Sequence, residues 1–265
     1  MILKDSWIKT NLYVCPKCKC SLDLLENSLC CEKCNKSFPI INGIPDFIIN
    51  ETHETIARII SIMKFMDLIA PIYETNFWQK LNLRLAGAKN SSLISLAEFH
   101  ANSLKGVTGN ILDIACGPIT YGRRLSNEFR RVYGIDISMG ILQRGKKYVE
   151  KEKRININLA RARVEELPFE NDFFNGAICS GSLHLFPEIT LTLQEIARTM
   201  KQGAPLSVQT FIAGNTIVNR ALKRQTWVHN FKLKELQEQF SNTGFKDFQW
   251  NLDGPIVITF RVNKS

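Results

Sequence analysis

The sequence predicts an α/β protein, in which helices cover both faces of a mostly parallel sheet with one antiparallel strand at its edge, preceded by a small cysteine-rich module. Three observations support this prediction. From Gly109 onward, short apolar runs alternate with amphipathic stretches, which is typical of parallel strands buried on both faces. A glycine turn at Gly117 follows the first of these runs. Six of the eight cysteines lie between Cys15 and Cys34.

Composition is that of an ordinary soluble globular protein, with 45% hydrophobic and 22% charged residues among 265. No apolar run approaches the roughly 20 residues that span a bilayer, and the first residues lack the apolar region of a secretory signal. We therefore expect no transmembrane segment and a cytoplasmic location. We expect three parts: a metal-binding module over 1–50, a helical linker or lid over 51–105, and the sheet-forming domain over 106–265.

Two CxxC knuckles dominate the first part. Cys15-Pro-Lys-Cys18 and Cys31-Glu-Lys-Cys34 are separated by twelve residues, a spacing at which four thiolates can converge on one tetrahedral Zn²⁺. Clustered cysteines in a reducing compartment indicate metal rather than disulfides. We therefore expect a structural zinc site that leaves no open position for chemistry. Cys30 is an alternative to Cys31 as the third ligand.

The helical part contains two stretches of helical period, IARIISIMKFMDLIA and NSSLISLAEFHANSL. Asn90-Ser91-Ser92 offers a cap for the second stretch. Ala70-Pro71 should break or kink the first.

Seven strands and four helices are expected in the sheet-forming domain. We predict strands near 110–115, 131–136, 155–160, 174–180, 204–211, 245–251 and 256–262. We predict helices near 119–129, 139–152, 188–201 and 232–243. The turn Asp253-Gly254-Pro255 should join the last two strands as a hairpin, which makes the sheet mixed at one edge.

The stretch ILDIACGPITYGRRL has the outline of a strand, a glycine turn and a helix. Asp113 ends the strand, and Gly117 lets the backbone approach a ligand while helix N–H groups face its anionic part. Asp136, twenty-three residues after Asp113, ends the next strand, where a carboxylate can accept hydrogen bonds from both ribose hydroxyls. The pattern predicts a nucleotide-like cofactor. A dinucleotide is disfavoured because GxGxxG is absent.

Four stretches occur in the order LDIACG, YGIDIS, VEELPFENDFFNGAICSGSLHLFP and EIARTMKQGAPL. Together they resemble the class I S-adenosylmethionine-dependent methyltransferases of the type 11 group, whose sheet is Rossmann-like. The resemblance implies an enzyme of that class and covers Gly109 to Phe260. The cysteine module resembles the small zinc-ribbon proteins that activate tRNA, rRNA and protein methyltransferases, through CPxC, CxxC and the tail FPIINGIP.

The same resemblance implies a cofactor site. The loop from Asp113 to Gly117, with Ala115 and Cys116, would hold the methionine part, and Asp136 the ribose. Ile137 and Val164 would flank the adenine, and Cys179 and Ser180 would face the amino group. DIACGPITY is locally similar to the DIGSGPTIY loop of small-amine N-methyltransferases, which makes Tyr121 a further candidate cofactor ligand, with ordinary packing at the helix start as the alternative. Core packing explains the apolar members equally well.

Three residues depart from the family pattern. Ala115 replaces a glycine but adds only a methyl group, which is easily accommodated. Ile119 replaces a glycine with a β-branched residue, which is unfavourable at positive φ. Arg163 replaces an aspartate that accepts a hydrogen bond from the adenine amino group, and arginine has no acceptor. Either Glu165 takes over this role, or backbone and packing alone hold the adenine.

Methyl transfer needs an aligned nucleophile, and it needs a base only if the acceptor must lose a proton early. His184 is the candidate base, and a structural role in shaping its loop is the alternative. Tyr73 is a second candidate catalytic residue, in a segment where the family often places a lid. Phe77 and Trp78 belong to the same segment.

Three functions are compatible with these patterns. The first is methyl transfer to a small, apolar or aromatic acceptor. The second is RNA methylation, because the segment 123–163 contains twelve Lys or Arg against four Asp or Glu and could contact phosphates; a merely solvated face is the alternative. The third is a cofactor-binding scaffold or cyclase that does not transfer methyl groups, suggested by Ile119 and Arg163.

Overall fold

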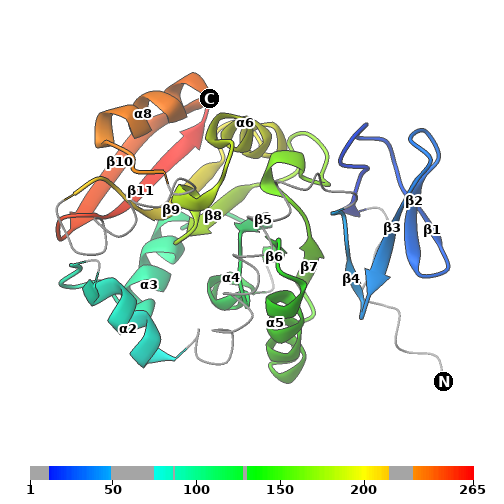
Figure 1. The fold of residues 1–265 in the computed structure, drawn as a ribbon, viewed down its shortest axis with the longest axis horizontal. Coiled ribbons are helices and arrows are strands. Elements are labelled where there is room, and N and C mark those ends of the chain that lie inside the picture. Colours follow the sequence, from blue (N-terminus) through cyan, green and yellow to red (C-terminus); the bar gives the residue numbers. More distant parts are fainter. Residues whose placement is uncertain (1–11, 49–74, 86, 128–129, 215–228) are drawn as a thin grey trace.

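The structure is a computed structural model that describes residues 12–48, 75–85, 87–127, 130–214 and 229–265 (Figure 1). Tyr73 lies outside the described residues, as does the whole of the first helical stretch, IARIISIMKFMDLIA. Among the described residues, no helix has the length and apolar character needed to cross a membrane.

A seven-stranded sheet forms the centre of the molecule, in the order β10-β11-β9-β8-β5-β6-β7 (Figure 1). The strands β5 to β9 are parallel, and β11 pairs antiparallel with both β9 and β10. Their bounds are β5 Gly109–Ile114, β6 Arg130–Asp136, β7 Ile157–Arg161, β8 Gly176–Ser180, β9 Pro205–Phe211, β10 Phe245–Asp253 and β11 Val257–Lys264. The predicted fold class is confirmed. The antiparallel strand lies second from the edge, because the hairpin inserts β11 between β9 and β10.

Helices cover the two faces of the sheet in two groups (Figure 1). One group comprises α2 Asn76–Leu85, α3 Leu93–Ser103, α4 Thr120–Leu125 and α5 Met139–Lys151, and the other comprises α6 Ile189–Thr199 and α8 Leu233–Asn242. Ser92 caps α3 by accepting a hydrogen bond from the Ser95 N–H, and Ser138 caps α5 in the same way with Ile141. Helix α4 ends four residues earlier than predicted, because Ser126 has an extended backbone.

The cysteine module is a four-stranded antiparallel sheet of strands β1 Asp23–Leu25, β2 Ser28–Cys31, β3 Lys36–Ile41 and β4 Ile44–Pro45. It lies beside the edge strand β7 of the large sheet (Figure 1). The Phe47 N–H donates to the Arg161 carbonyl at 2.8 Å, and the Arg161 guanidinium pairs with Asp46 at 2.9 Å. The module therefore covers a strand edge that would otherwise be open.

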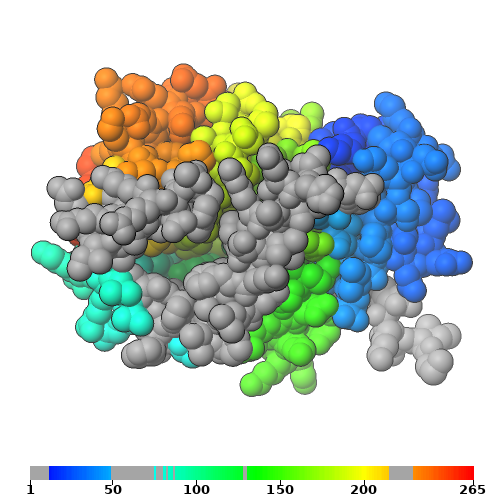
Figure 2. Space-filling view, viewed as in Figure 1, coloured from blue at the N-terminus to red at the C-terminus, as the bar shows by residue number. Residues whose placement is uncertain are grey.

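One apolar core runs from the module into the large sheet. Tyr13, Phe38 and Phe47 of the module belong to the same buried cluster as Tyr133 on β6 and Phe169. The Tyr13 ring lies 5.5 Å from the Phe169 ring, and the Phe169 ring lies 5.7 Å from the Tyr133 ring, edge to face. The space-filling view shows the module packed against the rest of the molecule (Figure 2). Its position is therefore fixed by burial as well as by polar contacts.

Candidate functional site

The carboxyl ends of β5, β6 and β8 lie at one edge of the sheet, because these strands are parallel neighbours. Asp113, Asp136 and Ser180 are found at this edge. The loop after β5 is a tight turn, in which the Cys116 N–H donates to the Ile135 carbonyl at 2.9 Å and the Ile119 N–H donates to the Cys116 carbonyl at 2.9 Å. The loop therefore passes directly over the end of β6.

Asp136 is held in place by two backbone N–H groups. Its Oδ2 accepts from the Gly117 N–H at 2.9 Å, and its Oδ1 accepts from the Ser138 N–H at 2.9 Å. The side chain is buried at the start of α5. A carboxylate can accept about four hydrogen bonds, so these two contacts orient Asp136 and are compatible with ribose binding.

Three alternate residues of the loop have left-handed backbone: φ is 49° at Ala115, 54° at Gly117 and 56° at Ile119. The loop thus keeps a conformation that favours glycine at two positions where glycine is absent. The fully buried Ile119 side chain lies against two glycines. A Cβ at Gly134 would lie 2.3 Å from Ile119 Cδ1, and a Cβ at Gly122 would lie 2.7 Å from Ile119 Cγ1. Burial of this side chain compensates for the unfavourable φ.

Asp113 is a buried carboxyl group below the loop. Its Oδ2 accepts from the Gly122 N–H at 3.0 Å, inside the first turn of α4. Burial raises the pKa of Asp113 to about 8, despite the favourable bond from Gly122. A cationic ligand beside this carboxyl would favour its ionised form.

Tyr121 of α4 contacts the end of β8 through its side chain. Its side chain hydrogen-bonds with that of Ser180, and burial raises the pKa of the Tyr121 hydroxyl to about 12. The edge of its ring meets the His100 ring at 5.1 Å. His100 is buried on α3, where its Nδ1 lies 2.9 Å from Ser207 Oγ. Tyr121 and Ser180, which were predicted separately as cofactor ligands, are therefore direct neighbours.

The segment after β7 bends toward Asp136, where the Ala162 N–H donates to the Asp136 carbonyl at 3.2 Å. A short 3₁₀ helix, Val164–Glu166, follows with Val164 buried. Arg163 Nε lies 3.5 Å from Glu165 Oε2. Glu165, one of the two predicted substitutes for the missing adenine acceptor, is thus an ion-pair partner of Arg163, which occupies the position of that acceptor.

His184 lies in a second 3₁₀ helix, Leu183–Leu185, beyond β8. Its Nδ1 is 3.2 Å from Thr210 Oγ1, and its carbonyl accepts from the His229 N–H at 2.8 Å. Burial, with a smaller contribution from His229, lowers the pKa of His184 to about 4. A buried imidazole of this kind is neutral at pH 7 and a weak base, so its environment does not favour the predicted role in proton removal.

The four predicted metal ligands converge. The Sγ atoms of Cys15, Cys18, Cys31 and Cys34 all lie within 4.8 Å of one another. A tetrahedral zinc with bonds of about 2.3 Å requires sulfur separations of about 3.8 Å. Cys18 accepts a hydrogen bond from the Cys20 backbone, which is the largest of the contacts that lower its thiol pKa to about 6. Cys31 accepts in the same way from the Cys34 backbone.

Cys30 lies outside this quartet. Its Sγ lies 3.5 Å from the Ser37 hydroxyl, because Cys30 and Cys31 are adjacent on β2 and point to opposite faces of the sheet. The donor set fits a tetrahedral metal through Cys31.

Several cations of the basic segment 123–163 have partners within the chain. Arg123 pairs with Glu152 at 3.0 Å, Arg130 donates to the Leu104 carbonyl, and Arg161 pairs with Asp46. Such contacts reduce the charge that could meet phosphates. An RNA partner is not supported.

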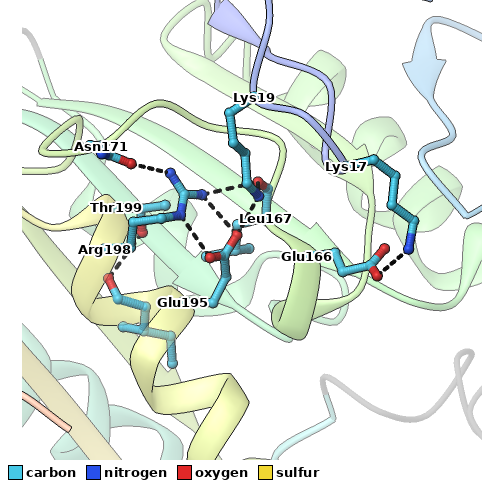
Figure 3. A network of polar contacts seen from close by, with 9 residues as sticks. Lys17, Lys19, Glu166, Leu167, Asn171, Glu195, Arg198 and Thr199 are labelled. Carbon is cyan, nitrogen blue, oxygen red and sulfur yellow. Dashed lines mark hydrogen bonds and ion pairs between the residues drawn. The ribbon is translucent and has the colours of Figure 1, made fainter. Parts of the chain in front are cut away.

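Sequence patterns did not identify Lys17 and Lys19 as residues that contact the sheet-forming domain. Lys17 pairs with Glu166, and Lys19 pairs with Glu195 (Figure 3). Their partners are 149 and 176 residues away along the chain. Nothing in the local sequence distinguishes these two lysines from other surface lysines. Only the docking of the module reveals these contacts.

Residues 111–203 match the family described as "Methyltransferase domain". This part of the chain is therefore similar to methyltransferase domains, and the match supports an enzyme that transfers methyl groups from S-adenosylmethionine. The chain is similar in fold to a solved structure of phosphoethanolamine N-methyltransferase 2 from Haemonchus contortus in complex with S-adenosyl-L-methionine. The similarity has a TM-score of 0.64 at 16% identity and covers 87% of this chain and 62% of that one.

Two curated relatives are similar over different extents. An uncharacterized chloroplastic methyltransferase of Arabidopsis thaliana is 21% identical, covering 96% of this chain and 78% of its own length. A 2-phytyl-1,4-naphtoquinone methyltransferase of Trichormus variabilis is 25% identical, covering 57% of this chain and 64% of its own length. The chain thus spans less than two thirds of the quinone methyltransferase. Because one relative is named as chloroplastic, a cytoplasmic location stays a prediction.

Proposed function

We propose that the protein transfers a methyl group from S-adenosylmethionine to a small, apolar or aromatic acceptor. The observation that supports this most is Asp136, held by the Gly117 and Ser138 N–H groups beside a loop with three left-handed residues. This arrangement offers a ribose acceptor and a close backbone approach on the same edge of the sheet.

The chain's residues would bind, orient and desolvate, while the cofactor supplies a methyl group on a positively charged sulfur. Asp113 and the loop Ala115–Gly117 would face the methionine part, with Tyr121 and Ser180 beside it. Ile137 and Val164 would enclose the adenine. Since an aligned acceptor needs little further help, proximity and exclusion of water account for most of the rate.

Aromatic side chains beyond β8 and β9 support an apolar or aromatic acceptor. The edge of the His184 ring meets Phe211 at 4.9 Å, and the His229 ring stacks on Phe231 at 5.4 Å. The named activity of the quinone methyltransferase relative fits such an acceptor loosely. His184 would orient the acceptor through the side of its ring that does not face Thr210.

Cys15, Cys18, Cys31 and Cys34 are proposed to bind a structural Zn²⁺. The converging sulfurs and the backbone N–H groups directed at Cys18 and Cys31 support this proposal. Four protein ligands complete a tetrahedral site, so the metal would stabilise the fold and take no part in methyl transfer.

Product formation tests the proposed activity. The purified protein would be incubated with S-adenosylmethionine carrying a tritiated methyl group and with three acceptor classes: demethylated naphthoquinols, small phenols, and total RNA. We expect label in at least one of the first two classes. Label in RNA alone would overturn the acceptor class, and label in none despite cofactor binding would favour a non-methylating role.

A further inference from the structure

The first cysteine knuckle contacts the methyltransferase domain through two lysines (Figure 3). Lys17 Nζ lies 2.5 Å from the Glu166 carboxylate. Lys19 Nζ lies 2.6 Å from Glu195 Oε1 and donates to the Leu167 carbonyl at 3.1 Å. The two lysines flank Cys18. Both therefore extend from the turn that would hold the metal.

The fold of the knuckle fixes the position of Lys19. The Lys19 N–H donates to the Cys15 carbonyl at 2.8 Å, and the Cys15 N–H donates to the Cys20 carbonyl at 2.8 Å. Lys19 has a φ of 59°, a conformation that is uncommon for a lysine and that these two bonds stabilise. A metal bound by Cys15 and Cys18 would close the same turn. Metal binding and the placement of the Lys19 side chain are thus physically connected.

Glu195 and Arg198 of α6 complete the contact. Arg198 Nε donates to Glu195 Oε2 at 2.7 Å, and another Arg198 nitrogen reaches the Leu167 carbonyl at 3.3 Å (Figure 3). The Leu167 carbonyl thus accepts from two cations. The side chains of Glu195 and Lys19 are 12% and 31% exposed, so their charge-assisted bond is partly shielded from water. Such a pair contributes more than an exposed one.

Two backbone hydrogen bonds from the module hold the segment 161–168, one on each side of Val164. The Val14 N–H donates to the Pro168 carbonyl at 3.0 Å, and the Phe47 N–H donates to the Arg161 carbonyl at 2.8 Å. The module thus binds the backbone of the stretch 161–168 at both of its ends. Val164 and Glu165, the expected neighbours of the adenine, lie between these anchors.

We propose that the cysteine module orders the adenine-binding segment 161–168, and that Lys19 is a positioning residue for S-adenosylmethionine. The proposal rests on the function proposed above. Lys19 acts through Leu167 and Glu195 rather than on the cofactor. A segment that is ordered before binding loses less conformational entropy when the cofactor arrives. Because linkage is reciprocal, a cofactor that binds the ordered segment more tightly also stabilises the docked module.

The test compares three variants of the full chain by isothermal titration calorimetry with S-adenosylmethionine. Lys19→Met removes the ammonium and keeps the stem, and Lys19→Arg retains the charge. Lys33→Met is the matched control, because Lys33 is an exposed lysine of the other knuckle. We expect Lys19→Met to raise the cofactor Kd about fivefold or more. Lys19→Arg and Lys33→Met should stay within about twofold of the parent.

Two further readouts separate positioning from other effects. Hydrogen exchange should quicken at the amides of 162–167 in Lys19→Met and remain unchanged on β5. 5′-Methylthioadenosine has the adenine and ribose but no sulfonium charge, so its Kd should rise by the same factor. An unchanged cofactor Kd in Lys19→Met overturns the inference. A loss for S-adenosylmethionine without a loss for methylthioadenosine also overturns it, because that pattern reflects charge rather than ordering.

Failure of the proposed function looks different, since the parent protein itself would then not bind the cofactor. If Lys19→Met does not fold, Lys17→Met tests the same idea, because Lys17 is half exposed and pairs with Glu166. We expect about a twofold rise in Kd there, with faster exchange at the same segment. Parent-like affinity and exchange in Lys17→Met would then reject the inference.

Discussion

The Gly117 N–H donates to Asp136 Oδ2 at 2.9 Å. This bond joins the loop after β5 to the end of β6 and fixes the carboxylate beside the only glycine of that loop. It lets the loop keep its shape although two of its three left-handed residues are Ala115 and Ile119.

Removal of the Asp136 carboxylate should weaken cofactor binding. Asp136→Ala loses the ribose acceptor and the bond from Gly117, so we expect the Kd for S-adenosylmethionine to rise about tenfold or more. Asp23→Asn, on the exposed strand β1, is the control and should bind like the parent. Calorimetric titration measures both. Equal affinities in Asp136→Ala and the parent would exclude Asp136 from the site.

Ile119 should show the cost of its backbone conformation. Ile119→Ala removes a buried side chain and should reduce the free energy of unfolding by about 2–5 kcal/mol. Ile119→Gly loses the same side chain but relieves the positive φ, so we expect it to be more stable than Ile119→Ala by about 1 kcal/mol. Urea unfolding at one pH compares the two. A glycine variant less stable than the alanine variant would show that the conformation is not strained.

Asp113 should make stability depend on pH. Its folded pKa of about 8 lies above its ordinary value of 3.8, so the folded state holds a proton that the unfolded state has lost. The resulting stabilisation is full below about pH 4 and is lost as pH rises through about 8. Asp113→Asn cannot titrate. Between pH 5 and 8 we therefore expect the free energy of unfolding to fall more in the parent than in Asp113→Asn.

The same titration predicts a proton release. A cationic cofactor beside Asp113 favours the carboxylate, so binding at pH 7 should expel a proton in the parent and not in Asp113→Asn. Calorimetry in two buffers of different ionisation enthalpy measures that proton. Identical proton release in both proteins would assign it to another group.

Substitution of Cys31, but not of Cys30, should remove the bound metal. Cys31→Ser should remove bound zinc and destabilise residues 12–48, because a tetrahedral site loses one of four ligands. Cys30→Ser should keep one zinc per chain, since Cys30 lies beside Ser37 instead. Elemental analysis of the purified variants distinguishes the two. Zinc retained in Cys31→Ser and lost in Cys30→Ser would reverse the ligand assignment.

Local patterns predicted most of the sheet. Alternation of apolar runs and amphipathic stretches placed β5 to β9 within about two residues, because burial on both faces demands continuous apolar strands. The spacing of Asp113, Gly117 and Asp136 similarly placed these residues on one edge, since parallel strands end on the same side. The CxxC spacing indicated the quartet, but it could not decide between Cys30 and Cys31 as the third ligand. That choice depends on which face of β2 each side chain occupies.

Contacts between distant parts of the chain could not be predicted. Lys19 and Glu195 belong to separate modules, and no local pattern links them. The Ile119 side chain fits because Gly122 and Gly134 have no Cβ beside it. Only the fold shows that these two glycines lie next to Ile119. The ion pair of Arg163 with Glu165 likewise required the bend after β7. Each of these features depends on packing rather than on propensity.

Titration of the purified protein with S-adenosylmethionine tests the account most directly. If the loop after β5 and Asp136 form a working cofactor site, one equivalent should bind per chain with a Kd well below about 1 mM, and Asp136→Ala should bind about tenfold or more weakly. Absence of binding by the parent at about 1 mM cofactor would contradict the proposed methyl transfer.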